Sequence, residues 1–418
     1  MKSAFAIVRP SFGAKILFFL LLSGPPKLRL RDPTASLDST IDWVIVLQIM
    51  VWLVAGCWVL LNSSILSSST SHEHSRFTKL EMISVILFFF LFLSIFFSEA
   101  PAFSAFKVYQ LIITFAIVTL FAKRYGVPEL LNNLFIGCGI LAVADIVAAF
   151  VMPNLVFVLS ELGTIRFRGD LIAQTGTVSV IGLFLLLTSK SDLPKRQFAF
   201  WALIFGIVLV FSLTRTSYLA VFVVVLLAAF RRPPIAVLRR AVTLVLMILP
   251  LLFGVLLDAL NAQRQAEDIW TLSDRLGLWT YLIDVTLQRG PWLGLGYFAA
   301  SRLYAPEYNP ALGTAHSAFM EVYAGGGFIS LAVFLAIWIV MAIQITRLYL
   351  ARPARIGFAV VALFCAAFFL NAIGGELQAE PAGFCFWCVV AALPLLPTER
   401  PEQAFVLAQS AAMHGGSC

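Results

Sequence analysis

Charged residues are scarce in this chain of 418 residues. Asp, Glu, Lys and Arg make up only 12% of the sequence, whereas soluble proteins carry roughly 25%. Hydrophobic residues make up 61%, and they include 38 Phe and 9 Trp. One aqueous core cannot bury that much apolar surface, so the composition excludes a soluble multidomain protein and indicates a polytopic membrane protein.

Cysteines and metal-ligating clusters are also few. Five of the six cysteines lie inside apolar segments, where they are expected to pack as small hydrophobic residues rather than form a disulfide framework. Cys385 and Cys388 have a CxxC spacing, but no second ligand pair accompanies them, which disfavours zinc or redox chemistry. The chain shows neither paired carboxylates nor His and Asp at metal-ligand spacing, so we predict no metal site and no cofactor.

Basic residues outnumber acidic ones, 29 against 22, but they occur in short clusters between apolar runs. That distribution argues against nucleic acid and indicates membrane topology signals. Assigning alternate loops to opposite faces places 18 of the 29 on one face, including Lys123-Arg124, Lys195-Arg196 and Arg231-Arg232. We expect this face and both termini to be cytoplasmic. Lys27, Arg29 and Arg31 fall on the other face and leave the first hairpin ambiguous.

Apolar runs of about 20 residues, the length needed to cross a bilayer, predict an all-α fold with about twelve transmembrane helices. No repeat or soluble domain is visible, so residues 1–418 are expected to form a single membrane domain. The first and last segments are the weakest. The predicted spans cover 12–24, 41–61, 82–97, 107–122, 130–152, 171–188, 198–213, 217–230, 241–260, 327–346, 356–375 and 383–397.

Arg215 is the only charged residue between positions 198 and 230. This run is too long for one span, and basic clusters flank both of its ends, so it must form a hairpin that turns near Arg215. Arg215 is then expected at the outer end of two helices. A snorkelling arginine is one interpretation, and a functional intramembrane charge is the other.

The longest stretch without a span runs over residues 261–315, between the ninth and tenth predicted spans. It contains several aromatic residues, including Trp270, Trp279, Trp292 and Tyr297. Long loops with such a composition are usually functional and fold as amphipathic helices on the membrane surface. We therefore predict a folded periplasmic loop.

Four outer-face elements are rich in polar side chains. Several arginines and one histidine, without a metal-binding cluster, describe a site for a polyanion, because the guanidinium fork matches phosphate oxygens. The elements contain Arg166, Arg168 and Asp170, then Arg215 and Ser217, then Asp274, Arg275 and Trp279, and finally His316, Ser317 and Glu321.

These elements resemble those of the O-antigen ligases, whose relatives include O-antigen and exopolysaccharide polymerases. Arg215-Thr-Ser-Tyr-Leu219 matches the R-x3-L element, and His316 followed by Gly327 matches H-x10-G. Asp274-Arg275-x3-Trp279 resembles the stretch that precedes the histidine. The resemblance covers about residues 160–345. The chain has Ser317 and Gln174-Thr175 where the family commonly has Asn and Pro-Asn.

The resemblance implies a membrane glycosyltransferase of the bacterial inner membrane, with its active site facing the periplasm. It would transfer a glycan from an undecaprenyl-pyrophosphate carrier to an acceptor without a metal. Arg215 and Arg275 would bind the pyrophosphate, and His316 would orient or deprotonate the acceptor hydroxyl. The further residues expected to contact the pyrophosphate or the glycan are Arg166, Arg168, Asp274, Trp279 and Glu321.

Two alternatives stay open within this interpretation and two outside it. A ligase would use lipid A core as acceptor, and a polymerase would use a second lipid-linked glycan; we favour the ligase. A polysaccharide transporter or flippase would also fit twelve spans, with Asp145 as the one midmembrane carboxylate that could couple to protons. A helix-to-helix hydrogen bond is the preferred role for Asp145. A purely structural subunit explains neither the outer-face arginines nor the aromatic loop.

Overall fold

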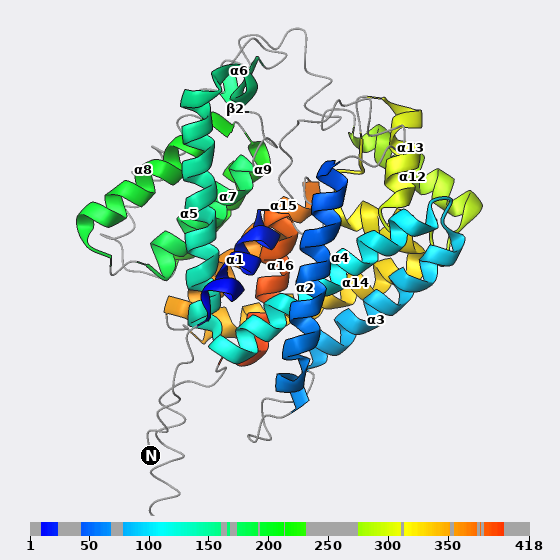
Figure 1. Cartoon of the computed structure of the whole chain (residues 1–418), viewed down its shortest axis with the longest axis horizontal. Helices are drawn as coiled ribbons and strands as arrows, with labels where there is room; N and C mark the ends of the chain where they lie inside the picture. Colours follow the sequence, from blue (N-terminus) through cyan, green and yellow to red (C-terminus); the bar gives the residue numbers. More distant parts are fainter. Residues whose placement is uncertain are drawn as a thin grey trace, which may run out of the picture.

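The structure is a computed structural model of the whole chain. It describes residues 10–23, 43–67, 78–159, 165–167, 174–190, 193–212, 214–230, 275–310, 313–351, 355–373, 377 and 380–396. The described part is almost entirely α-helical, as the sequence predicts, and its helices pack into one bundle (Figure 1).

The first half of the chain supplies helices α1 to α9 in order along the sequence. Apart from the short α6, each of them overlaps a predicted apolar run, and its bounds differ from the predicted ones by no more than six residues at either end. Their bounds are α1 (Phe12–Leu22), α2 (Trp43–Ser67), α3 (Lys79–Leu93), the 3-10 turn η2 (Ser94–Phe97), α4 (Pro101–Tyr125), α5 (Val127–Val151), α6 (Pro153–Val156), α7 (Thr175–Thr188), α8 (Lys195–Ser212) and α9 (Arg215–Phe230).

The second half supplies five further described helices and begins with the predicted periplasmic stretch. α12 (Arg275–Arg289) and α13 (Ala299–Tyr308) belong to that stretch, and they lie beside α14 (Figure 1). The remaining elements are α14 (Ala318–Leu350), α15 (Arg355–Ile373), α16 (Pro381–Ala392) and the 3-10 turn η3 (Leu393–Leu395).

One small β-hairpin interrupts the helical pattern between α6 and α7. β1 (Phe157–Leu159) pairs antiparallel with β2 (Ile165–Phe167). The rings of Phe157 and Phe167 face each other across the hairpin at 5.3 Å, and Phe167 packs on Phe211 of α8 at 5.2 Å. The hairpin is therefore fixed to the end of α8.

Seven helices of the described part are long and apolar enough to cross a membrane: those within α2, α3 with η2, α4, α5, α8, α14 and α15. Four shorter apolar helices match the predicted segments 12–24, 171–188, 217–230 and 383–397. The segment 241–260 lies outside the described residues. Of the twelve predicted spans, eleven thus correspond to apolar helices in the described part, and seven of these helices are long enough to cross a membrane.

The shortest of these helices, α1, has 11 residues, and at 1.5 Å per residue it covers only about half of a hydrocarbon core about 30 Å thick. One side of α1 is buried inside the bundle. Phe18 packs against Phe121 of α4 and Phe384 of α16, with ring centroids 4.9 and 4.8 Å apart. Tertiary packing, rather than length, therefore holds this segment in place.

Candidate active site

The starts of α7, α9 and α16 lie at one end of the bundle. The side chain of Gln174, just before α7, donates a hydrogen bond to the carboxylate of Glu380, which precedes α16. A Cβ atom added to Gly176 would lie 2.6 Å from Thr214 Oγ1, so the beginnings of α7 and α9 are in direct contact. Arg215, the first residue of α9, is therefore at this end.

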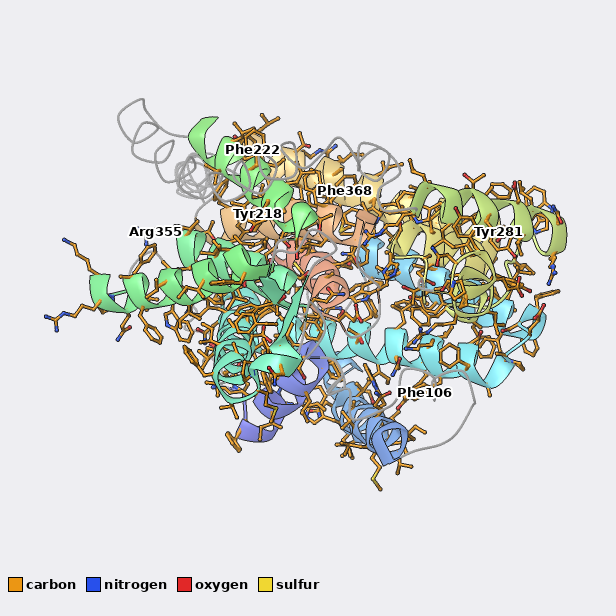
Figure 2. All side chains as sticks on the ribbon, turned by 90° about the horizontal axis from the view of Figure 1, so that it is seen from above. Phe106, Tyr218, Phe222, Tyr281, Arg355 and Phe368 are labelled. Carbon is orange, nitrogen blue, oxygen red and sulfur yellow. The ribbon has the colours of Figure 1, made fainter. Side chains whose placement is uncertain are left out.

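The start of α14 lies at the same end. Phe319, in its first turn, contacts Phe368 near the end of α15, with ring centroids 6.4 Å apart. Asn371 of α15 donates a hydrogen bond to the carbonyl of Ala382 in the first turn of α16. Helices α9 and α15 pack against each other, and Figure 2 labels Tyr218 and Phe222 on α9 and Phe368 on α15. The elements that contain Arg215 and His316 consequently converge on one face of the protein.

Helix α14 bends sharply at Gly327. This residue has φ 67° and ψ −168°, which no helical residue adopts. Phe319 and Phe334 lie on opposite sides of it and would be about 22 Å apart in a straight helix, yet their ring centroids are 5.1 Å apart. The first part of α14 therefore folds back toward the second.

The segment between α12 and α13 holds this bend through its backbone. The N–H of Leu295 donates to the carbonyl of Ala324, and the N–H of Gly296 donates to that of Gly325. On the other side of the bend, the N–H of Phe328 donates to the carbonyl of Pro291 at 2.9 Å. These bonds satisfy groups that lose their helical partners at the bend. The backbone of Trp292 lies so close to Gly327 that a Cβ atom there would be 2.4 Å from a main-chain carbon.

His316 lies immediately before the folded-back part of α14, and its backbone is left-handed, with φ 51°. The residue before it, Ala315, is fully buried and is held on both sides. Its N–H donates to Glu321 Oε1 at 3.1 Å, and its carbonyl accepts from Trp279 Nε1 at 2.8 Å. The other carboxylate oxygen of Glu321 accepts a hydrogen bond from Ser301 Oγ at 2.6 Å.

Arg275 begins α12 one turn before Trp279, so the two residues share a face of that helix. Burial lowers the pKa of the Arg275 guanidinium from its ordinary value, but an arginine keeps its charge at neutral pH. Because Trp279 bonds to Ala315, the face of α12 that carries Arg275 lies against the segment that carries His316. The R-x3-W spacing of Arg275 and Trp279 therefore corresponds to one helix face turned toward the segment that carries the histidine.

A small apolar core stabilises this arrangement apart from the main bundle. Leu278 and Leu282 of α12, Ala300 and Tyr304 of α13, and Ala324 of α14 are buried together. On its rim, the Tyr304 hydroxyl donates to Glu99 and accepts from Arg289 Nη1 at 2.9 Å. Burial and the Glu99 carboxylate raise the pKa of Tyr304 to about 12. The part of the predicted periplasmic loop that the structure describes is thus folded.

The remaining predicted residues are placed less fully. Arg166 belongs to β2, opposite Val158, and the structure describes its backbone. Because β2 packs on the end of α8, this backbone lies near the turn that leads to Arg215. The side chain of Arg215, and all of Arg168 and Asp274, lie outside what the structure describes.

Sequence reasoning missed Ser301 and the interhelical role of the Pro291–Gly296 backbone, since a lone serine and backbone bonds carry no motif.

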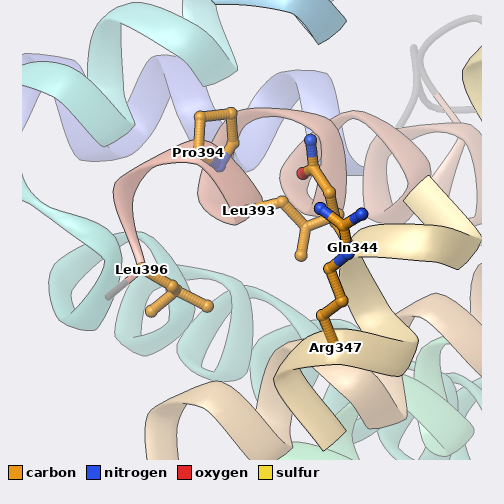
Figure 3. A pocket seen from close by; sticks show the side chains of 5 residues that line it. All are labelled: Gln344, Arg347, Leu393, Pro394 and Leu396. Atoms are coloured by element: carbon orange, nitrogen blue, oxygen red, sulfur yellow. The ribbon is translucent and has the colours of Figure 1, made fainter. Parts of the chain in front are cut away.

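Among the described residues, no group of three His, Cys, Asp or Glu side chains could hold a metal ion. A cavity of about 500 Å³ lies at the far end of α14, between Gln344 and Arg347 and the η3 segment (Figure 3). It is remote from His316 and belongs to no part of this site.

Fold and site together define a multi-pass membrane protein with arginine, histidine and aromatic elements gathered at one end of its helix bundle. Residues 198–335, which run from α8 into α14, match the family model described as O-antigen ligase. For this part of the chain, the match confirms the resemblance to the O-antigen ligases that the motifs indicate. No curated protein matches the chain.

Proposed function

We propose that this protein transfers a glycan from an undecaprenyl-pyrophosphate carrier to an acceptor on the periplasmic face of the bacterial inner membrane. One observation carries the proposal. Arg215 at the start of α9 and His316 just before α14 converge at one end of the bundle, inside the region that matches the O-antigen ligase family. In this proposal both termini are cytoplasmic, residues 1–418 form one membrane domain, and residues 261–315 face the periplasm.

The proposed chemistry needs positive charge at the leaving group and a base at the acceptor. Arg215 and Arg275 bind the donor pyrophosphate, with Arg166 and Arg168 assisting, and their guanidinium groups stabilise the charge that develops on it. His316 accepts the proton of the acceptor hydroxyl, because an imidazole titrates near neutral pH. The acceptor oxygen then bonds to the anomeric carbon as the sugar-phosphate bond breaks, and undecaprenyl pyrophosphate leaves.

Ligase and polymerase share this chemistry and differ only in the acceptor. We favour O-antigen ligase activity, with lipid A core as acceptor, because the R-x3-L and H-x10-G elements are those of ligases and the matching family model carries that description. In a polymerase the acceptor would be a second lipid-linked repeat unit, and no other group in the mechanism would change.

A transporter is the second candidate, and Asp145 of α5 motivates it. This carboxylate is 2% exposed, and its Oδ2 atom has no hydrogen-bond partner among the described atoms. The expected helix-to-helix bond for that oxygen is therefore not seen. A buried carboxylate can carry protons in a transporter, but Asp145 lies on α5, which contributes neither of the two family elements.

The test is transfer in liposomes that contain a defined undecaprenyl-pyrophosphate glycan, with lipid A core and a second lipid-linked glycan as competing acceptors and EDTA present. Wild type, Arg215→Ala and His316→Ala are compared, with Glu307→Ala as a control on the same face. Product on lipid A core that both site variants lose supports the ligase. A ladder of longer lipid-linked glycans identifies a polymerase, and product that persists in both variants refutes the assigned residues.

A further inference from the structure

We infer that Glu321 is a positioning residue for His316, acting through the backbone of Ala315, and that Trp279 supplies the opposing half of the same clamp. The role of His316 rests on the proposed function, but the clamp is a feature of the fold. Two side chains from different helices hold the N–H and the carbonyl of one residue, Ala315, directly before the histidine.

The surroundings of Glu321 argue for this role rather than for substrate contact. Its side chain is 1% exposed, although carboxylates are almost never fully buried without partners. Its two oxygens accept from the Ala315 N–H and from the hydroxyl of Ser301 on α13. Both oxygens thus bond to the protein's own chain, on the buried side of the segment that carries His316.

His316 needs such support because its backbone is left-handed. A residue with a Cβ atom disfavours φ near 50°, so the surrounding contacts must hold it there. Glu321 and Trp279 fix the backbone of Ala315 just before this torsion. Just after it, the carbonyl of Ser317 accepts the first helical bond of α14 from the N–H of Glu321. The backbone of His316, which carries the imidazole, is therefore held by hydrogen bonds on both sides.

Glu321 and Trp279 differ in whether a substitution of similar size keeps the hydrogen bond to Ala315. Glutamine at position 321 keeps an oxygen that accepts from the Ala315 N–H. In wild type the Ser301 hydroxyl donates to Glu321; in the variant the glutamine NH2 group can donate to the Ser301 oxygen instead. Phenylalanine at position 279 keeps most of the ring packing but removes the N–H that donates to the Ala315 carbonyl. A positioning role therefore predicts that Glu321→Gln is tolerated, whereas Glu321→Ala and Trp279→Phe are not.

The experiment measures kcat and KM for the lipid-linked donor in the liposome assay. Glu321→Ala and Trp279→Phe should lower kcat about tenfold to hundredfold, as small misplacements of a catalytic group do, with donor KM changed less than about threefold. Glu321→Gln should keep kcat within about threefold of wild type. Glu307→Ala is the control. Glu307 of α13 is also a glutamate that accepts a hydrogen bond, but its partner is Tyr281 of α12 and not Ala315, and that bond is exposed.

Two kinetic results overturn the inference. If Glu321→Gln is as inactive as Glu321→Ala, the carboxylate charge itself takes part in the chemistry. If the variants raise donor KM and leave kcat unchanged, Glu321 contacts the substrate instead.

A second measurement judges the clamp without any activity. Hydrogen exchange of the peptide that contains residues 313–318 should be faster in Glu321→Ala and Trp279→Phe than in wild type, and unchanged in Glu321→Gln. If wild type shows no transfer, the proposed function fails while this exchange still tests the clamp. Equal exchange in all variants overturns it.

Discussion

The ring of Phe319 stacks on that of Trp338, with centroids 5.9 Å apart and planes inclined by 24°, although both residues belong to α14. Along a straight helix they would be about 28 Å apart. The bend at Gly327 brings them together, so the last residue of the H-x10-G element sets the path that His316 follows. In this protein the motif describes a backbone geometry as well as the position of a histidine.

Gly327→Ala should destabilise the protein and abolish most of its activity. A Cβ atom there would lie 2.4 Å from the Trp292 backbone, and φ 67° disfavours any residue other than glycine by about 1–2 kcal/mol. Thermal unfolding in detergent micelles, followed by tryptophan fluorescence, measures the effect. Gly206→Ala is the matched control, because nothing lies within 4 Å of a Cβ atom at that position of α8. Equal midpoints for the two variants would contradict the structural role of the bend.

Arg275→Lys should lower kcat/KM for the lipid-linked donor about tenfold, since lysine keeps the charge but loses the two-pronged bond to phosphate. The burial that lowers the pKa of Arg275 would also lower that of a lysine at this position. The remaining activity should therefore fall further as the pH rises toward the lysine pKa. Initial rates between about pH 7 and about pH 9 test this, with Arg289→Lys, which keeps its pair with Glu99, as the control. Unchanged kinetics would remove Arg275 from the donor site.

Tyr304 should make the α12–α13 unit sensitive to alkaline pH. Its folded pKa is raised to about 12, from an ordinary value near 10. The folded state therefore keeps a proton that the unfolded state loses between these values, and stability falls as the pH rises through that window. The midpoint of thermal unfolding, measured from about pH 8 to about pH 11, should drop more steeply in wild type than in Tyr304→Phe. Parallel curves would show that the hydroxyl is not held as the structure places it.

Asp145→Asn distinguishes transferase from transporter. Its Oδ2 atom has no partner among the described atoms, so an amide should fit with little loss of stability. We expect glycan transfer to stay within about twofold of wild type, while His316→Ala loses it. Loss of function in Asp145→Asn combined with retention in His316→Ala would instead favour proton-coupled transport. The liposome assay reads both variants side by side.

Much of the site was predictable from residue order, but not the partners of each side chain. The lone charge in a long apolar run placed Arg215 at a turn between two helices, and α9 does begin there. Trp279 and Glu321 were expected to contact substrate. The structure shows both bonded to Ala315, from which we infer a positioning role. Contact with substrate is the alternative that the donor KM of the variants decides. Spacing places side chains on a helix face, whereas contacts between distant segments depend on packing.

The sequence by itself determined that the protein belongs in a lipid bilayer, that its fold is helical, and where its apolar helices lie. Hydrophobic run length and charge placement are local quantities, so the sequence alone specifies them. It also indicated the family, through four short elements in a fixed order. Only the tertiary structure decided that the predicted span at 12–24 is a short packed helix, that α14 folds back at Gly327, and that Glu321 and Trp279 hold the two backbone polar groups of Ala315. Each of these depends on which distant backbone and side-chain groups meet, and no local pattern specifies that.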